Sequence, residues 1–420
     1  MCTLFAMFVI AAPAFAQPPE RFEPPRPGTL LPGFLRDQLK LTPEQKKKLD
    51  ELQKDADKGS DAILTKEQKK TLEDLRVRGP FPNGFNPQLP QTEPAPPRKI
   101  KKVEATETNI RKAVEKALPT LWTALEGYND VHTCFACHHH GTALVAFGIA
   151  RTRGYDIPEK KLQAQIDFLA ADLERNQKNY EKGRGPGPAP AGGETDNTCY
   201  QLLAFDAIGY KPSKSTETLI SYTLGNQKSR DNWFTPADRA PTEGSSFTTT
   251  ALNIRGIQAY RTKDQKAVAD KRIDAAKGWL VKTAAKDNED RVFRLIGLVA
   301  AKAESGDIEQ ATEDLVKTQR EDGGWRQTDS MASDPYATAT ALYALQTAGG
   351  LKVDDAAIRK GVAFLLGTQE DDGTWFVKTH SKPVQRYFES GFPHGKDQFI
   401  SCAATGWATA VLALATPSKK

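Results

Sequence analysis

The stretch KGVAFLLGTQEDDGTW, residues 360–375, decides the fold. Its apolar positions predict one amphipathic helix, which gives way to a polar loop carrying Gln369 and, six residues later, Trp375. The same spacing separates Gln319 from Trp325 and Gln227 from Trp233. A motif that recurs at this scale predicts an array of one supersecondary unit.

The repeated unit from residue 105 onward is a helical hairpin. One helix of each pair is charged on one face and is expected in an outer layer, whereas its partner is apolar all round and is expected to be buried. The outer helices are predicted near 108–125, 159–176, 214–225, 271–284, 307–318 and 354–367, and the inner helices begin near His138, Asp196, Phe247, Asp290, Tyr336 and Ser401. The sequence therefore predicts an all-α protein with an (α/α)6 toroid over 105–420.

The Gln and Trp loops resemble the QW repeats of squalene cyclases and oxidosqualene cyclases. The resemblance covers 105–420 and implies the α/α toroid shared by squalene cyclases, protein prenyltransferases and complement thioester domains. It also implies that Trp233, Trp325 and Trp375 are structural braces between outer helices rather than ligand contacts.

The catalytic signatures of those families are absent from this sequence. The chain has no DxDD acid motif of class II cyclases and no GCGEQ thioester, and Asp196 and Cys199 do not match the D-x-C zinc pair of prenyltransferases. A shared fold does not carry these activities over. A cyclase-like or lyase-like enzyme and a non-catalytic binding toroid both remain open.

The N-terminal quarter is read as three segments. Residues 1–16 end in Ala14-Phe15-Ala16 after an apolar stretch and predict a signal peptide for export to the periplasm or cell envelope. Residues 17–78 carry Leu41-Thr42-Pro43-Glu44-Gln45 and a second copy at 64–68, which resemble the LTxxQ repeats of Spy-like proteins and predict a short charged helical hairpin. Residues 79–104 form a Pro-rich linker.

The most specific chemical motif is Cys134-Phe135-Ala136-Cys137-His138. In a closed ring the loops that enter the first, second and sixth inner helices are expected to meet at one mouth of the toroid, and this motif lies in the first of them. C-x-x-C-H is the attachment motif of c-type haem, in which two thiols bond the haem and the histidine ligates its iron. Export makes such attachment chemically permitted. The distal ligand is open between His394, Met331 and His140, or the iron is five-coordinate. A redox or ligand-binding role follows from this hypothesis.

Two other interpretations of the cysteines stay open. Zinc or another transition metal is expected to take a tetrahedral set from six candidate ligands: Cys134, Cys137, His138, Cys199, Cys402 and His394. Alternatively, Cys134–Cys137 or Cys199–Cys402 form a disulfide. His139 and His140 are expected at the surface of a helix start, and His132 and His380 in plain loops.

Acids at the starts of inner helices are weak catalytic candidates, namely Asp196, Asp334 and Asp397, together with Glu389 in the loop before the last helix. A pair of them could act as general acid and base on an apolar or saccharide ligand. The balance of 58 basic and 53 acidic residues argues against a nucleic-acid partner. No internal apolar run is long enough to predict a membrane span in the mature chain.

Overall fold

The computed structural model describes residues 30–31, 39, 41–66, 68–69, 100–186, 194–227, 230–235, 239–381 and 387–418. The chain divides into two units, residues 1–91 and 92–420, and each is treated by itself. The predicted signal peptide and the prolines of the linker lie outside the described residues, as does Cys2.

The first unit contains helix α2, Pro43–Ile63. Its predicted capping box is confirmed, because Gln45 N–H donates to Thr42 Oγ1 while the Gln45 side chain accepts from Thr42 N–H. The second LTxxQ copy makes the same two bonds between Thr65 and Gln68. Most of the helix predicted to follow lies outside the described residues.

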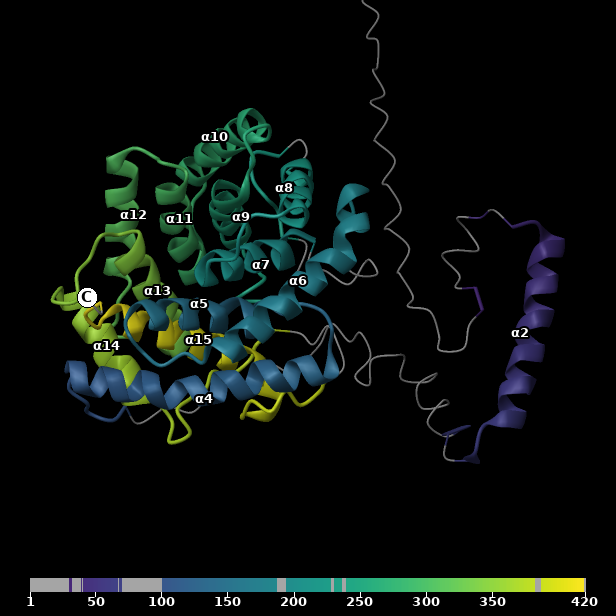
Figure 1. The fold of residues 1–420 in the computed structure, drawn as a ribbon, viewed down its shortest axis with the longest axis horizontal. Coiled ribbons are helices and arrows are strands. Elements are labelled where there is room, and N and C mark those ends of the chain that lie inside the picture. Colours follow the sequence, from purple (N-terminus) through teal and green to yellow (C-terminus); the bar gives the residue numbers. More distant parts are fainter. Residues whose placement is uncertain are drawn as a thin grey trace, which may run out of the picture. The chain divides into compact units, whose positions relative to one another are not determined.

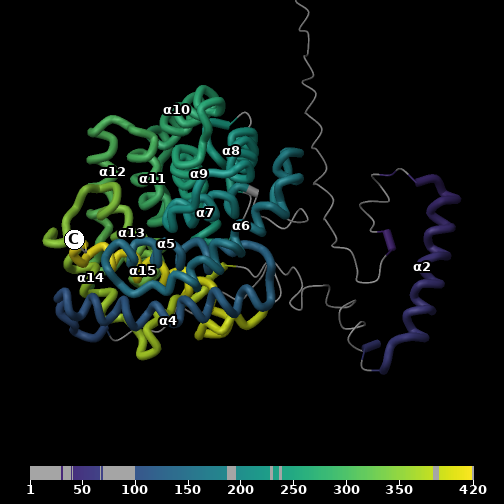
Figure 2. Tube along the Cα trace, in the orientation of Figure 1, coloured from purple at the N-terminus to yellow at the C-terminus, as the bar shows by residue number. Residues whose placement is uncertain are grey.

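The second unit is built around a closed ring of inner helices. Each inner helix contacts the next, and the last contacts the first, so that α15 lies beside α5 (Figures 1 and 2). The inner helices that the structure describes are α5 (Thr142–Thr152), α7 (Glu194–Ile208), α9 (Ser246–Tyr260), α11 (Asn288–Ala300), α13 (Pro335–Thr347) and α15 (Gln398–Leu414). This ring closure confirms the predicted toroid.

An outer helix precedes each inner helix along the chain. The outer helices are α4 (Glu107–Val131), α6 (Glu159–Glu181), α8 (Lys214–Asn226), α10 (Lys266–Lys282), α12 (Ser305–Lys317) and α14 (Ala356–Thr368). They lie close to the predicted ranges, although α4 and α6 continue further and α10 begins earlier. Two short helices, η1 (Cys137–Gly141, a π-helix) and η2 (Gly395–Asp397), precede α5 and α15. Within the described ranges the only β-structure is two isolated bridges.

Close backbone approach between inner helices depends on small residues. A Cβ at Gly148 of α5 would lie 2.1 Å from the carbonyl oxygen of Ala207 in α7, and one at Gly406 of α15 would lie 2.6 Å from Thr142 Oγ1 in α5. Glycine at these positions lets the inner ring pack tightly.

Across the described ranges we find no helix with the length and hydropathy that crossing a bilayer requires.

The QW loops join neighbouring outer helices. Gln369 Nε2 at the end of α14 donates to the carbonyl oxygens of Gly373 in its own loop and of Ala113 in α4, at 2.9 and 2.8 Å. Gln319 links α12 to α14 through Ala357, and Gln227 links α8 to α10 through Arg272.

The tryptophans of the QW loops hold the outer helices against the inner helices. Trp233, Trp325 and Trp375 are fully buried, and each indole N–H donates to a carbonyl oxygen of the preceding outer helix, at 2.7–2.9 Å. Each backbone N–H of these residues donates to a threonine of the following inner helix. The tryptophans are therefore structural braces, as the resemblance implied, but they join each outer helix to the following inner helix, whereas the glutamines join outer helices.

Candidate functional site

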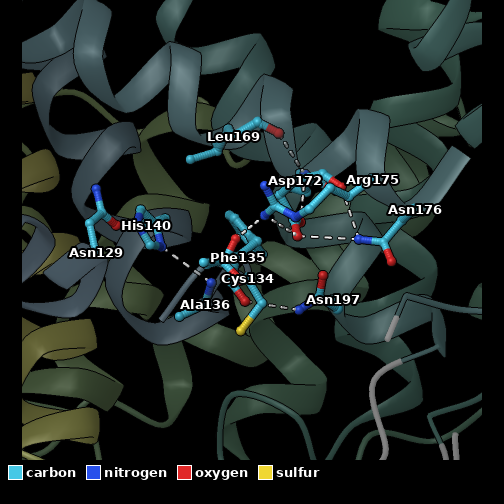
Figure 3. A network of polar contacts seen from close by, with 12 residues as sticks. Asn129, Cys134, Phe135, Ala136, His140, Leu169, Asp172, Arg175, Asn176 and Asn197 are labelled. Atoms are coloured by element: carbon cyan, nitrogen blue, oxygen red, sulfur yellow. Dashed lines mark hydrogen bonds and ion pairs between the residues drawn. The ribbon is translucent and has the colours of Figure 1, made fainter. Parts of the chain in front are cut away.

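The Cys134–Ala136 loop is anchored through its backbone (Figure 3). Arg175 of α6 donates to the carbonyl oxygen of Thr133, and Asn197 of α7 donates to that of Phe135 at 3.3 Å. The backbone N–H of Phe135 bonds the buried Asp172 carboxylate. The loop is held by one outer helix, α6, and by one inner helix, α7, and such anchoring keeps its side chains in fixed positions.

The two thiols of the motif face different surroundings. Cys134 is exposed, and its Sγ lies 3.4 Å from Tyr128 Oη. Cys137 is buried, with Sγ 4.0 Å from the carbonyl oxygen of Asp196, and burial raises the pKa of its thiol. Both cysteines are free, so the predicted Cys134–Cys137 disulfide does not form in this structure.

The prediction that His139 and His140 lie at the surface is wrong, because both side chains are fully buried. His140 Nδ1 accepts from Ala136 N–H at 3.2 Å, and its Nε2 lies 2.9 Å from Asn129 Oδ1, an acceptor. His140 is thus a neutral Nε2–H tautomer with both nitrogens used inside the fold. Burial lowers the pKa of both His139 and His140 to about 3.

A chain of hydrogen bonds fixes the tautomers of His138 and His139. Gln398 Nε2 donates to Phe388 O at 2.8 Å, so Gln398 Oε1 is the acceptor for Ser390 N–H at 3.1 Å and for the Ser390 hydroxyl at 2.6 Å. The single hydroxyl proton of Ser390 is thereby used. Ser390 Oγ must then accept from His139 Nε2–H at 3.0 Å.

The same logic continues to His138. A neutral His139 protonated on Nε2 has a bare Nδ1, which accepts from His138 Nδ1–H across 2.6 Å. Burial lowers the pKa of His138 well below its ordinary value, so this ring is also neutral. His138 Nε2 therefore carries an unprotonated lone pair, the form in which imidazole ligates a metal.

Replacing Ser390 by alanine is expected to destabilise the protein by about 1–3 kcal/mol, because His139 Nε2–H would be buried without an acceptor. Chemical denaturation measures this change. Nitrogen-15 NMR of the imidazoles reports whether His138 and His139 keep their tautomers. Ser330→Ala at an exposed loop position is the matched control and should change the free energy of unfolding by less than about 0.5 kcal/mol. Equal unfolding free energies for the two variants would contradict the assigned chain.

The remaining predicted metal ligands are held by other contacts, although Cys199 lies beside Cys137, because both Sγ atoms contact the carbonyl oxygen of Asp196. Cys199 is buried and donates to the carbonyl oxygen of Asp196 at 3.1 Å, and Cys402 is buried in α15. His394 Nε2 lies 2.7 Å from Thr374 Oγ1 in the third QW loop. Both Cys199 and Cys402 are free, so they do not form the alternative disulfide. In the described part of the chain, no three Cys, His, Asp or Glu side chains are grouped so that they could hold a metal ion.

The four acidic candidates are engaged in local structure. Asp196 accepts from the hydroxyls of Thr235 and Thr249 at 2.6 and 2.5 Å. Asp334 caps α13 through two backbone N–H groups. Asp397 accepts from Lys378 Nζ and Thr379 N–H, and Glu389 is exposed and accepts from the Tyr387 hydroxyl. No two of these four carboxylates are bonded to one another or to a shared partner in the described contacts.

A fifth acid, Glu289, was missed by the sequence reasoning. It lies in the first turn of α11, 5% exposed, and lines a cavity of about 40 Å³ together with Asn288, Gln327, Tyr336 and His380. Burial, with Asp287 as the next cause, raises the pKa of Glu289 well above its ordinary value. The raised pKa favours the protonated, neutral form of this acid at the start of α11.

A sequence signal for Glu289 exists in Asp287-Asn288-Glu289-Asp290, which differs from DxDD by one side-chain methylene. Ser390 and Gln398 were also missed, and for them no comparable signal exists. Their role depends on the loop before α15 reaching the π-helix η1, a contact between residues more than 240 positions apart.

Tyr200, buried against Gly141 of η1, is within electrostatic reach of both Cys137 and Glu289.

Two comparisons by sequence match the second unit to the same kind of protein. A model of the squalene-hopene cyclase C-terminal domain matches residues 250–419, which run from α9 to α15. The toroid is squalene-cyclase-like. Squalene–hopene cyclase of Bradyrhizobium diazoefficiens is 27% identical over 209 residues, which are 48% of this chain but only a quarter of that enzyme. The C-x-x-C-H motif lies outside the residues that the family model matches.

Two solved structures of the type II terpene cyclase MstE from Scytonema are similar in outline. The apo enzyme is 14% identical, with a TM-score of 0.48 over 73% of this chain and 99% of its own. A variant in complex with its substrate, geranylgeranyl dihydroxybenzoate, is 15% identical, with a TM-score of 0.49 over 74% of this chain and 97% of its own.

Proposed function

We propose that this chain is an exported haem c protein built on a squalene-cyclase-like toroid. Cys134 and Cys137 would hold the haem as thioethers, and His138 Nε2 would ligate its iron. Such a group supplies one-electron transfer or the binding of a small ligand at its iron. The role that we assign to the protein is redox or ligand-binding, with a redox partner meeting the mouth of the toroid on the side of the exposed Cys134.

The observation that carries this proposal is the tautomer of His138. Its Nδ1–H is directed at His139, and the Ser390–Gln398 pair holds His139 in turn. A histidine that ligates a metal through Nε2 characteristically donates its Nδ1–H to such a partner, which fixes the ring and raises the basicity of the ligand nitrogen. The donor chemistry of the motif therefore fits a haem ligand.

The separation of the cysteines and histidines favours haem over zinc. A structural zinc ion needs about four protein donors around one point. Of the six candidate ligands, all of which lie in described ranges, no three are grouped in that way. Haem c requires one imidazole nitrogen at the iron and two free thiols at the edge of the ring. The motif contains these three groups, and attachment would require the buried Cys137 thiol to leave its place beside Asp196 O.

The test is a pyridine haemochrome spectrum of the full chain, expressed with its N-terminal segment in a host that matures c-type cytochromes. We expect covalently bound haem and about one iron per chain. The Cys134→Ala/Cys137→Ala variant should lose the haemochrome completely. Cys402→Ala removes a buried thiol outside the motif and is the matched control, which should keep the spectrum.

Two outcomes would overturn the proposal. One is an exported chain without haemochrome, and the other is a haemochrome that survives loss of both thiols. Stoichiometric zinc in place of iron would support the zinc hypothesis instead. Retention of the chain inside the cell would remove the compartment on which haem attachment depends.

A further inference from the structure

The cavity beside Glu289 lies apart from the C-x-x-C-H motif and has a polar lining that the haem proposal does not use. Its walls come from the loop before α9, the start of α11, the loop before α13 and the segment after the third QW loop. Its volume of about 40 Å³ is enough for about three water-sized positions. A site of this size accommodates the end of a small molecule.

Three buried polar atoms of the lining have no hydrogen-bond partner among the described residues. They are Glu289 Oε2, Asn288 Oδ1 and Gln327 Nε2, on side chains that are only 4–5% exposed. The other end of each side chain is fixed. Glu289 Oε1 accepts from Thr248 and Tyr336, Asn288 Nδ2 donates to Ala337 O, and Gln327 Oε1 lies 2.7 Å from His380 Nε2.

These contacts determine what each free atom offers. The bond to Gln327 Oε1 places a proton on His380 Nε2. Partial desolvation lowers the pKa of the exposed His380, so its Nδ1 is a bare acceptor. Asn288 Oδ1 is a second acceptor. Gln327 Nε2–H is a donor, and the acid proton of neutral Glu289 makes Oε2 a second donor. The lining thus presents two donors and two acceptors.

The charge of the lining argues against an ion. No lysine or arginine lines the cavity, and Asp287 is part of its wall, so an anion would meet no counter-charge. Asp287 would favour a cation, but the amide N–H of Gln327 would face it, and the raised pKa of Glu289 disfavours ionisation of the second acid. A hydroxyl group, by contrast, accepts one hydrogen bond and donates another.

We propose that this cavity binds a pair of neighbouring hydroxyl groups, as found at the end of a polyol or on a saccharide ring. One hydroxyl accepts from Glu289 and donates to Asn288, while the other accepts from Gln327 and donates to His380. Tyr336, which bonds Glu289, holds the acid in place. The site is independent of haem attachment, and it specifies the saccharide class of ligand left open by the sequence.

The test is a titration of the purified full chain, followed by ligand-observed NMR. The probes are glycerol, erythritol and methyl glucoside, with 1-propanol as the single-hydroxyl control and ethylamine as the cation. We expect saturable binding of the vicinal diols, at least about tenfold tighter than that of 1-propanol.

Three variants assign the binding to this cavity. Glu289→Gln keeps a hydrogen-bond donor and should bind diols within about threefold of the parent chain. Glu289→Leu and Gln327→Met remove a donor each and should weaken binding by at least about tenfold. Glu313→Gln changes an exposed acid on α12 and should have no effect. Near-UV circular dichroism confirms that each variant is folded, and the loop variant Gln327→Met keeps the test decisive should Glu289→Leu not fold.

Each contrary outcome would overturn the inference. Binding of ethylamine that is abolished in Glu289→Gln would make this a cation site. Failure of every diol to saturate would mean that the cavity holds only water. Diol binding that survives both Glu289→Leu and Gln327→Met would place it elsewhere on the molecule.

Discussion

Replacing Trp375 by alanine is expected to destabilise the toroid by about 3–5 kcal/mol. The indole is fully buried, and its N–H donates to Leu365 O at 2.7 Å. Truncation leaves a large cavity between α14 and α15 and an unpaired carbonyl oxygen. The substitution should lower the stability of the whole ring, because Gln369 of the same loop joins the last outer helix, α14, to the first, α4.

Chemical denaturation followed by circular dichroism measures this effect. Trp375→Phe keeps most of the buried ring while losing the N–H, and should cost less than the alanine variant. Phe234→Ala removes an aromatic ring that is 49% exposed, and is the matched control. A Trp375→Ala variant as stable as Phe234→Ala would show that the QW loops do not brace the toroid.

Glu289→Gln is expected to remove a large pH dependence of stability. The folded pKa of Glu289 is raised above its ordinary value of 4.5, so the folded chain holds a proton that the unfolded chain has released. Stability from this group is fully present below pH 4.5 and is lost as the pH rises toward the folded pKa. The slope over that interval is about 1.4 kcal/mol per pH unit, and the neutral glutamine should abolish it.

Urea denaturation of the parent chain and of Glu289→Gln, from pH 5 to pH 9, checks this prediction. The stability advantage of the variant should grow with pH. Glu313→Gln, at an exposed position, should follow the parent chain at every pH. Parallel curves for the parent and Glu289→Gln would mean that Glu289 is ionised in the folded protein.

Short-range patterns in the sequence were enough to predict the architecture. The spacing of Gln369 and Trp375, the small-residue inner helices and the capping boxes depend on residues within a few turns of one another. Such patterns predict helices and their order along the chain. Because six hairpins of similar length form a ring only when the last packs against the first, the repeat number also predicted the contact of α15 with α5.

The tautomers of His138 and His139 and the pKa of Glu289 were decided by tertiary structure. The sequence placed C-x-x-C-H before an inner helix, but the protons on His138 and His139 follow from Ser390 and Gln398, which reach them from the other end of the chain. The raised pKa of Glu289 likewise follows from burial and from the neighbouring Asp287, and it persists although the hydroxyls of Thr248 and Tyr336 donate to the carboxyl and lower it. Local sequence determined which helices form, whereas ring closure determined which polar atoms lose water, and desolvation sets both the tautomers and the pKa values of the site.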